Sequence, residues 1–268
     1  MVTIGLVGCG TIGSRLALEI QRRFRGAARL VGVHDRDAKA ARRLVRRLHS
    51  AIPVLPLQQL VSHSQLLIEA ASASAVGQIL REVVAQRKSI LVMSSGGVLQ
   101  NGALLRKAVR LNIPIYLPSG ALVGLDGVKA GAIGRLRSVT LTTRKPPRAL
   151  AGAPGVIRRR IRLSSIRTPR RIFQGSALQA VAEFPQNINV AATLALAGVG
   201  ATRTRVRIVA DPTIRANIHE LEAVGTFGKL FARTENRPAQ ENPKTSQLAV
   251  FSAIATLQQI LQPLRVGT

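Results

Sequence analysis

The chain has 268 residues, 46% of them hydrophobic, which is enough for two modest domains with sizeable cores. Lysine and arginine number 39 against 12 acidic residues, so the formal net charge is +27. No apolar run reaches the roughly 18 residues of a membrane span, and the one cysteine cannot form an internal disulfide. With its first strand beginning at once, the chain leaves no room for a signal peptide, so we expect a cytoplasmic protein that does not bind membranes.

The positive charge would attract polyanions in a salt-dependent way. Only 3% of the residues are aromatic, however, with no tryptophan and one tyrosine. Stacking platforms for single-stranded nucleic acid are therefore scarce. We expect solvated, arginine-rich faces and non-specific polyanion binding, but no specific nucleic-acid partner. No metal site is predicted.

A dinucleotide-binding turn is predicted at the N-terminus. An apolar run, Ile4–Val7, leads into a Gly-x-Gly-x-x-Gly motif, and a helical pattern over 14–24 follows. This order of strand, glycine-rich turn and helix suits a pyrophosphate, which would accept hydrogen bonds from free N–H groups at the helix N-terminus. The cofactor residues predicted in this turn are Gly8, Gly10, Thr11, Ile12 and Gly13.

A second apolar run, 30–33, ends at His34, Asp35 and Arg36. Asp35 lies 22 residues after Gly13, where an acid accepts the ribose hydroxyls. It favours NAD by repelling a 2′-phosphate, whereas Arg36 would stack on adenine or bind that phosphate. The cofactor is therefore predicted as NAD or NADP, with a slight preference for NAD.

The first 120 residues alternate between strand and helix patterns, which predicts an α/β, Rossmann-type, doubly wound parallel sheet. The strands are expected at 3–7, 30–33, 66–69, 89–93 and 113–116, and further helices at 38–49, 76–86 and 103–111. Ser72 and 94–97 follow expected strands at their carboxyl ends, where open α/β sheets bind ligands. Ala71 and Ser72 are accordingly predicted to contact the cofactor, although such segments are as often plain turns.

After residue 120 the pattern changes to that of an α+β substrate domain. Strands are expected at 139–143, at 204–209 and in parts of 218–233, and a helix from 190 onward. Residues 152–169 are expected to form a long surface loop and 237–244 a linker. The C-terminal segment 245–264 has helical spacing and is expected to return to the nucleotide domain. The predicted domains are 1–120 with 241–268, and 121–240.

Several segments along the whole chain resemble L-aspartate dehydrogenases. They are Glu69-Ala-Ala-Ser72, Met93-Ser-Ser-Gly-Gly97, Pro118-Ser-Gly-Ala121, Phe173-Gln-Gly-Ser-Ala177, Phe184-Pro-Gln-Asn-Ile-Asn-Val-Ala-Ala192 and Ala210-Asp-Pro212 leading to Asn217-Ile-His-Glu220. The glycine motif is common to many oxidoreductases, so the resemblance depends on the last two segments. The glutamine after Phe173 and the acid-poor composition depart from the family's usual pattern.

The resemblance implies that His219 is catalytic and that Ala121 and Asn189 contact the cofactor. His219 is also the only histidine of the second half, and a neutral imidazole can accept and return a proton near pH 7. Asn187 could exchange roles with Asn189, or either could cap the helix. Glu220 and Asp211 are expected to hold His219 or a substrate-binding arginine.

The implied reaction is oxidative deamination of L-aspartate to iminosuccinate and then to oxaloacetate and ammonia, feeding NAD biosynthesis or aspartate metabolism. Arginine suits the two substrate carboxylates best, but the sequence does not indicate which arginines bind them. The resemblance also implies a homodimer through the sheet of the second domain.

Three alternatives remain open. The chain could oxidise or reduce another amino or imino acid on the same fold. It could be a dinucleotide-sensing protein that binds nucleic acid through its basic face, although a sensor has no need of His219. It could also be a degenerate member of the family.

Overall fold

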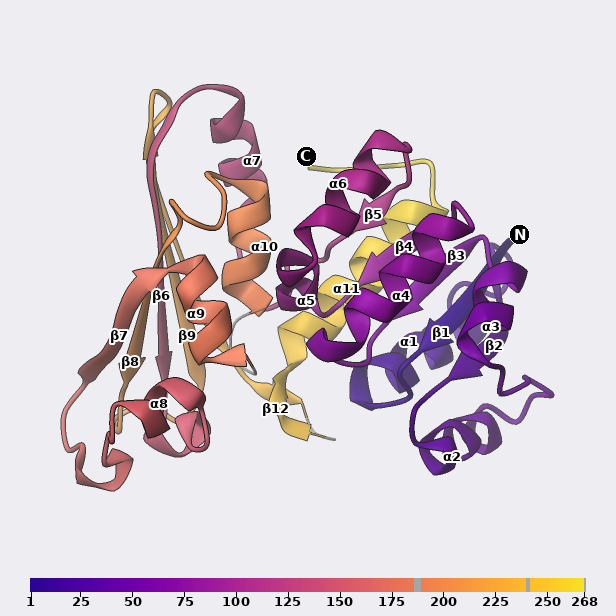
Figure 1. Ribbon diagram of the computed structural model, residues 1–268, viewed down its shortest axis with the longest axis horizontal. Helices are drawn as coiled ribbons and strands as arrows, with labels where there is room; N and C mark the ends of the chain where they lie inside the picture. The colour runs from indigo at the N-terminus through magenta and orange to yellow at the C-terminus, as the bar shows by residue number, and fades with distance from the viewer. Residues whose placement is uncertain (186–188, 240–241, 268) are drawn as a thin grey trace. The chain divides into compact units, whose positions relative to one another are not determined.

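The computed structural model describes residues 1–185, 189–239 and 242–267. They divide into two compact units. The N-terminal unit comprises Met1–Pro118 and Val250–Arg265, and the second unit comprises Ser119–Ala249 with the last residues of the chain. The predicted fold class, a Rossmann-type α/β domain followed by an α+β domain, is confirmed (Figure 1). No helix among the described residues is long and apolar enough to span a membrane.

The N-terminal unit is built on a five-stranded parallel sheet with strand order β2-β1-β3-β4-β5. The order reverses between β1 and β3, which is the switch point at which doubly wound sheets bind ligands. Its strands are β1 (Val2–Val7), β2 (Ala28–His34), β3 (Leu66–Glu69), β4 (Ser89–Val92) and β5 (Ile115–Tyr116). All five coincide with predicted strands to within two residues at each end.

Helices cover both faces of this sheet. They are α1 (Thr11–Arg22), α2 (Ala38–Leu48), α3 (Leu57–His63), α4 (Ala73–Ala85), α5 (Ser95–Gln100), α6 (Gly102–Arg110) and α11 (Gln247–Leu261). Asp37 is the N-cap residue of α2, and its side chain accepts a hydrogen bond from the Lys39 N–H. The sequence prediction missed α3 and α5, because seven and six residues are too few for a clear helical period.

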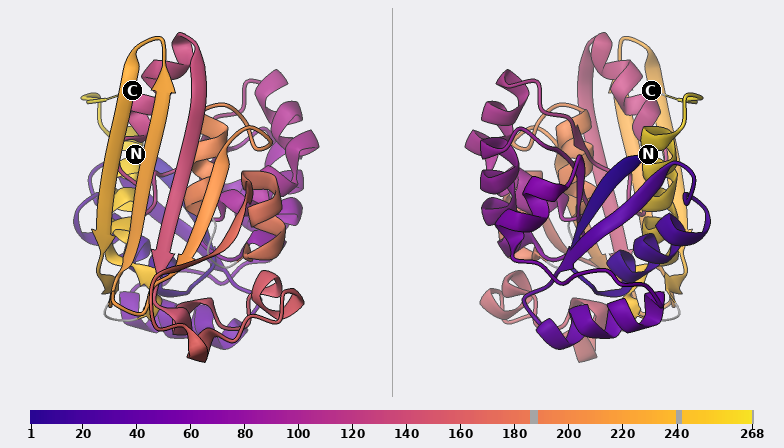
Figure 2. Two further views of the ribbon diagram at one scale, coloured as in Figure 1. Left: turned by 90° about the vertical axis from the view of Figure 1, so that its left-hand side faces the viewer. Right: turned by 90° about the vertical axis from the view of Figure 1, so that its right-hand side faces the viewer.

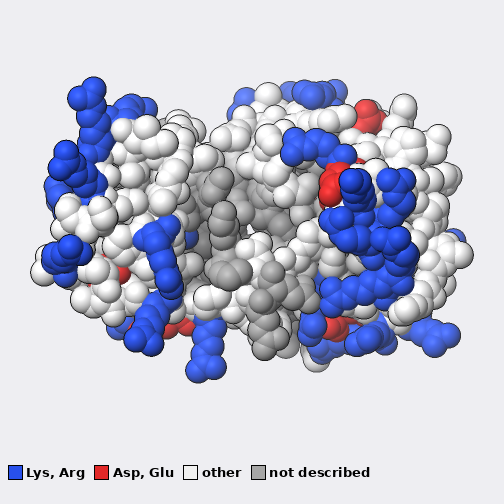
Figure 3. All heavy atoms as spheres, turned by 90° about the horizontal axis from the view of Figure 1, so that it is seen from below, with Lys and Arg blue, Asp and Glu red and all other residues white. Residues whose placement is uncertain are grey.

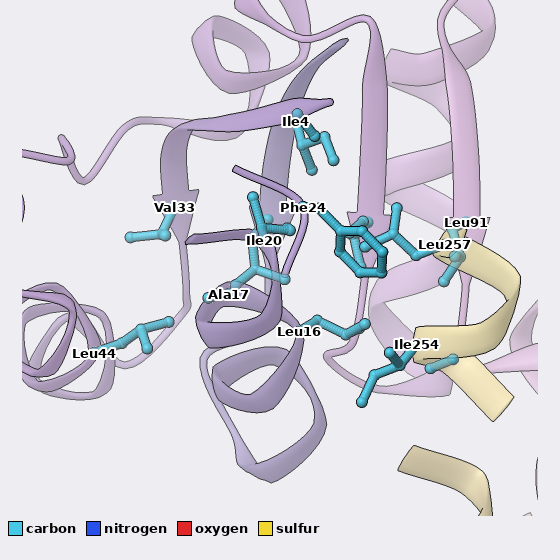
Figure 4. Packing of buried hydrophobic residues seen from close by; sticks show 14 of the residues in the cluster. Ile4, Leu16, Ala17, Ile20, Phe24, Val33, Leu44, Leu91, Ile254 and Leu257 are labelled. Carbon is cyan, nitrogen blue, oxygen red and sulfur yellow. The ribbon is translucent and has the colours of Figure 1, made fainter. Parts of the chain in front are cut away.

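The core on one face joins distant parts of the chain (Figure 4). Leu16 and Phe24, in and just after α1, pack with Leu91 of β4 and with Ile254 and Leu257 of α11. On the other face, Gly5 of β1 lies against Leu60 of α3, where a Cβ would approach the leucine within 2.9 Å. The C-terminal helix therefore completes the N-terminal unit by burying apolar side chains beside α1.

The second unit is built on a mixed five-stranded sheet with strand order β10-β9-β6-β8-β7. Strand β6 runs parallel to β8 and antiparallel to β9, and β7 and β10 are antiparallel to their neighbours. The strands are β6 (Leu136–Lys145), β7 (Arg170–Ser176), β8 (Arg205–Ala210), β9 (Asn217–Gly225) and β10 (Gly228–Asn236).

Only one face of this sheet is covered by helices of the unit, as the left view of Figure 2 shows. The helices are α7 (Leu125–Ile133), α8 (Pro154–Arg158), α9 (Ala177–Glu183) and α10 (Asn189–Ala197). Buried and less buried residues alternate along β6 and β9, in keeping with one covered and one open face. We refer to these as the covered face and the open face.

Two expectations for the second unit were wrong. The segment 152–169 is not a plain loop, because it contains α8 and a 3₁₀ turn over Leu163–Ser165. The segment 237–244 is not a plain linker, because it contributes the short strands β11 (Pro238–Ala239) and β12 (Asn242–Ser246). Glycine, proline and arginine made both segments look irregular, and short elements stabilised by tertiary contacts leave little local pattern.

Basic side chains far outnumber acidic ones on the surface seen in Figure 3. Helix α2 illustrates the arrangement, because Arg42, Arg43, Arg46 and Arg47 are exposed whereas Leu44 is buried. The arginines of α2 therefore occupy its solvated face.

Candidate active site

The glycine motif forms a tight turn between β1 and α1. Gly8 has φ +96°, and a Cβ there would lie 2.5 Å from the backbone of Ala70. A Cβ on Gly13 would lie 1.9 Å from the Gly8 carbonyl oxygen, so α1 packs on the turn too closely for any side chain. Gly10, by contrast, has open space around its Cα. Two glycines thus serve the fold, and the third leaves room for a ligand.

The N-terminus of α1 suits an anion. Gly10 is the N-cap residue, no side chain caps this end, and the first turn contains no acid. The N–H groups of Thr11 and Ile12 therefore lie at the positive end of the helix dipole. The turn fits the pyrophosphate of a dinucleotide.

Asp35 lies beside this turn and fixes its shape. Its Oδ2 accepts a hydrogen bond from the Cys9 N–H at 2.7 Å, and its Oδ1 accepts one from the Asp37 N–H at 2.8 Å. Arg36 is exposed to solvent. Burial and the charge of Asp35 raise the pKa of the Cys9 thiol to about 12, so Cys9 is an inert part of the turn.

Glu69 connects the segments that follow β3 and β4, and sequence analysis did not single it out. This fully buried carboxylate accepts hydrogen bonds from the Ala71 N–H at 2.8 Å, the Ser94 hydroxyl at 2.9 Å and the Ser94 N–H at 2.9 Å. Burial raises its pKa, and these hydrogen bonds offset part of that effect. Ala71 and Ser72 are left exposed, whereas 94–97 form the buried start of α5.

Replacing Glu69 with glutamine tests this connection. One acceptor oxygen becomes an NH₂ group, which leaves a buried N–H without its partner. We expect the free energy of unfolding to fall by about 1–3 kcal/mol, and NADH to bind more weakly because the two segments lose their common anchor. Chemical denaturation and fluorescence titration measure these effects, with Glu82→Gln on α4 as the control. Unchanged stability and affinity in Glu69→Gln would contradict the role of Glu69.

His219 lies on β9, on the covered face of the sheet in the second unit. It is 4% exposed. Its cross-strand neighbours are Thr143 on β6 and Thr234 on β10. The Thr143 hydroxyl lies 3.0 Å from the His219 Nδ1 and fixes the orientation of the ring. When Nδ1 carries the proton and donates it to Thr143, Nε2 retains its lone pair.

The imidazole is neutral in the free protein. Burial, with a smaller contribution from the charge of Lys145, lowers the pKa of His219 to about 3. Lys145 lies on β6, two residues beyond Thr143, and burial lowers its own pKa to about 8. A titratable pair with strongly shifted pKa values on one buried face is typical of a functional site.

The lowered pKa of His219 predicts a pH-dependent stability. In the unfolded chain the imidazole takes up a proton below about pH 6.5, but the folded protein resists this down to about pH 3. The contribution of His219 to the free energy of unfolding is therefore fully present above pH 6.5. It is lost as the pH falls towards 3, by at most about 1.4 kcal/mol per pH unit. Denaturation between pH 6.5 and 4 should show a smaller loss for His219→Gln than for the wild type. Parallel curves would contradict a buried neutral imidazole.

The expected acidic partners of His219 are not its partners in the structure. Glu220 follows His219 on β9, so its side chain lies on the open face, where it forms an ion pair with Arg144 at 3.2 Å. Asp211 is buried beside the end of β6, and its Oδ1 accepts hydrogen bonds from the Thr213 N–H and hydroxyl. The hydrogen-bond partner of the His219 Nδ1 is therefore the Thr143 hydroxyl, and not a carboxylate.

Ala121 is connected to the strand beside His219. Its carbonyl oxygen accepts hydrogen bonds from the Thr234 hydroxyl at 3.0 Å and the Asn236 side chain at 3.1 Å. Since Thr234 is directly opposite His219, the structure brings Ala121 and His219 into one part of the second unit. Asn189 is exposed at the start of α10, and Asn187 lies outside the described residues.

The chain matches known families over most of its length. Residues 126–260 match the family "Aspartate dehydrogenase, C-terminal", and residues 8–118 match "Homoserine dehydrogenase, NAD binding domain". The chain is 45% identical to the L-aspartate dehydrogenase of Methanocella arvoryzae and 42% identical to that of Methanosarcina barkeri, in each case over the whole of both chains. The crystal structure of aspartate dehydrogenase from Thermotoga maritima has the same fold, with a TM-score of 0.76 and 24% identity over both full chains. The chain belongs to the L-aspartate dehydrogenase family.

Proposed function

We propose that the protein is an NAD(P)-dependent L-aspartate dehydrogenase. The single observation that carries this proposal is the buried group of His219, Thr143 and Lys145, in a chain of this family that also has an open pyrophosphate turn. A neutral imidazole beside a buried cation suits proton transfer on a substrate that carries two carboxylates.

The residues present fit a nicotinamide dinucleotide. The N–H groups at Gly10, Thr11 and Ile12 would hold the pyrophosphate, and Asp35 would accept ribose hydroxyls with the lone pairs that Cys9 and Asp37 leave free. The negative charge of Asp35 disfavours a 2′-phosphate, so we propose NAD as the preferred cofactor. Ala71, Ser72, Ala121 and Asn189 remain proposed cofactor contacts, and Arg36 would lie beside the adenine. The cofactor supplies a hydride acceptor for the substrate Cα–H.

His219 would act on the proton transfers that accompany oxidation. Its Nε2 takes a proton from the substrate amine, or from the water that adds to iminosuccinate on the way to oxaloacetate and ammonia. A proton on this buried ring is unfavourable in the free protein, as its lowered pKa shows. The negative charges of the bound substrate would raise that pKa and so make the transfer feasible. Thr143 would hold the ring in position.

A substrate comparison tests the proposal. We expect NADH formation from L-aspartate at mildly alkaline pH, and little or none from L-alanine, L-glutamate or L-homoserine at equal concentration. Turnover of one of these three with none of L-aspartate would overturn the proposed substrate. NADH binding without turnover of any amino acid would instead favour a sensing role. Whether the imine passes to NAD biosynthesis or is hydrolysed first would follow from trapping the released product.

We further propose a cytoplasmic homodimer with 121–240 as the catalytic and dimerising domain and 1–120 with 241–268 as the cofactor domain. The open face would meet a second copy. It carries Phe231, which is 60% exposed, and a cavity of about 420 Å³ lined by threonines, arginines and Glu222. For nucleic acid we propose only non-specific binding.

Substitution at the open face tests the dimer. Phe231→Glu places a charge where two copies would meet, so we expect the sedimentation coefficient to fall from that of a dimer to that of a monomer. Val109→Glu, at an exposed position of the N-terminal unit, is the control. A wild type that sediments as a monomer, or a Phe231→Glu variant that remains a dimer, would contradict this interface.

A further inference from the structure

We propose that Lys145 binds a carboxylate of the substrate beside His219, in place of the arginines that the composition suggests. This inference rests on the proposed function, because it assigns part of the binding site for a dicarboxylic amino acid. Among the residues whose side chains the structure describes, Lys145 is the only lysine or arginine that is buried.

The register of the sheet places Lys145 next to the imidazole. Thr143 is opposite His219 and bonded to it, and Lys145 follows two residues later on the same face. Diagonal neighbours of this kind are about 7–8 Å apart in a sheet, which a lysine side chain can bridge. An anion held by the ammonium group would therefore lie beside the ring.

Four arginines of these strands are excluded by their direction, and Arg170 of β7, whose cross-strand neighbour Ala210 lies on the covered face, is exposed rather than buried. Alternation along β6 and β8 puts Arg144 and Arg207 on the open face, where both line the cavity described above. Arg171 of β7 lines that cavity too, and Arg233 of β10 lies near Glu220 of the open face. None of these four guanidinium groups shares the covered face with His219.

Burying a lysine costs free energy, and burial here lowers its pKa to about 8. Among the described residues, His219 on β9 and Asp211 after β8 are titratable groups on the neighbouring strands. A substrate carboxylate would offset the buried charge and would stabilise the ammonium form. A dicarboxylate should therefore bind more tightly than a monocarboxylate of the same length.

Binding of succinate, an unreactive dicarboxylate, tests this directly. We would titrate succinate and butyrate into the NADH complexes of the wild type, Lys145→Met and Lys129→Met by calorimetry. Methionine keeps the length of the side chain without its charge, and Lys129 is an exposed residue of α7. Loss of a charge-assisted hydrogen bond should weaken succinate binding about 10- to 100-fold in Lys145→Met. Lys129→Met should bind succinate as the wild type does.

Butyrate then identifies the carboxylate concerned. If Lys145 binds the side-chain carboxylate, butyrate binding changes little in Lys145→Met, and the KM for L-aspartate rises with a smaller change in kcat. If Lys145 binds the carboxylate that both ligands share, butyrate weakens as well. Succinate affinity within twofold of the wild type in Lys145→Met would overturn the proposal.

Lys145→Gln is a second variant, which retains a polar end. Its thermal unfolding and NADH affinity show whether the fold survives. If Lys145→Met is unstable, succinate affinity in Lys145→Gln is judged by the same twofold criterion. If the wild type binds succinate through Lys145 but does not oxidise L-aspartate, the proposed function would be overturned and the carboxylate-binding site would stand. If the wild type oxidises L-aspartate and Lys145→Met has the same KM for it, only the proposed role of Lys145 would be overturned.

Discussion

His219→Ala is expected to lower kcat for L-aspartate oxidation by about 10²- to 10⁴-fold, the usual contribution of a positioned acid–base group. The substitution removes the one imidazole on the covered face of the described part of the second unit. NADH affinity should be unchanged, because His219 is not one of the proposed cofactor contacts. Steady-state kinetics at saturating substrate and an NADH titration measure the two effects.

Thr143→Val and His63→Ala complete this experiment. Valine retains the shape of threonine but removes the hydroxyl that lies 3.0 Å from the His219 Nδ1, so we expect an intermediate loss of about tenfold in kcat. His63 is exposed at the end of α3, and its substitution should leave kcat as it is. A His219→Ala enzyme that turns over at the wild-type rate would exclude His219 from the reaction.

Gly13→Ala and Gly10→Ala are expected to separate folding from cofactor binding. A Cβ on Gly13 meets the Gly8 carbonyl oxygen at 1.9 Å, so the backbone must shift and the free energy of unfolding should fall by about 3 kcal/mol. A Cβ on Gly10 meets no protein atom within 4 Å, so stability should change by less than about 1 kcal/mol. It occupies the space proposed for the phosphates, and NADH should bind at least about tenfold more weakly.

Chemical denaturation and fluorescence titration of both variants measure these effects. The two glycines belong to the same turn, so each variant is the matched control for the other. Equal NADH affinity in Gly10→Ala and the wild type would show that the phosphates lie elsewhere. A Gly13→Ala protein as stable as the wild type would contradict the close packing of α1 on the turn.

The N-terminal unit could be predicted in detail because its signals are local. The run Ile4–Val7, the glycine motif and the helical spacing that follows each indicate one structure, and neighbouring elements agree. The helical spacing of 245–264 likewise predicted α11. Short elements such as α3, α5 and α8 were missed, since tertiary contacts rather than periodicity define them.

The environment of His219 depends on strand register, which one sequence does not reveal. Thr143 is 76 residues away in the chain, and only the pairing of β6 with β9 makes it a neighbour. Glu220 does not hold His219, and the reason was visible beforehand, because adjacent residues of a strand face opposite sides. The same alternation places Val139, Leu141, Thr143 and Lys145 on one face of β6, and it would have indicated that Lys145 is buried.

The most direct test of the account uses L-aspartate deuterated at Cα. If the protein removes this atom as a hydride, mass spectrometry of the reduced cofactor will show one deuterium per molecule formed. In parallel, Lys145→Met and His219→Ala should form labelled cofactor more slowly, and Lys129→Met at the wild-type rate. Reduced cofactor without deuterium, or none formed from L-aspartate, would contradict the proposal that this protein oxidises aspartate.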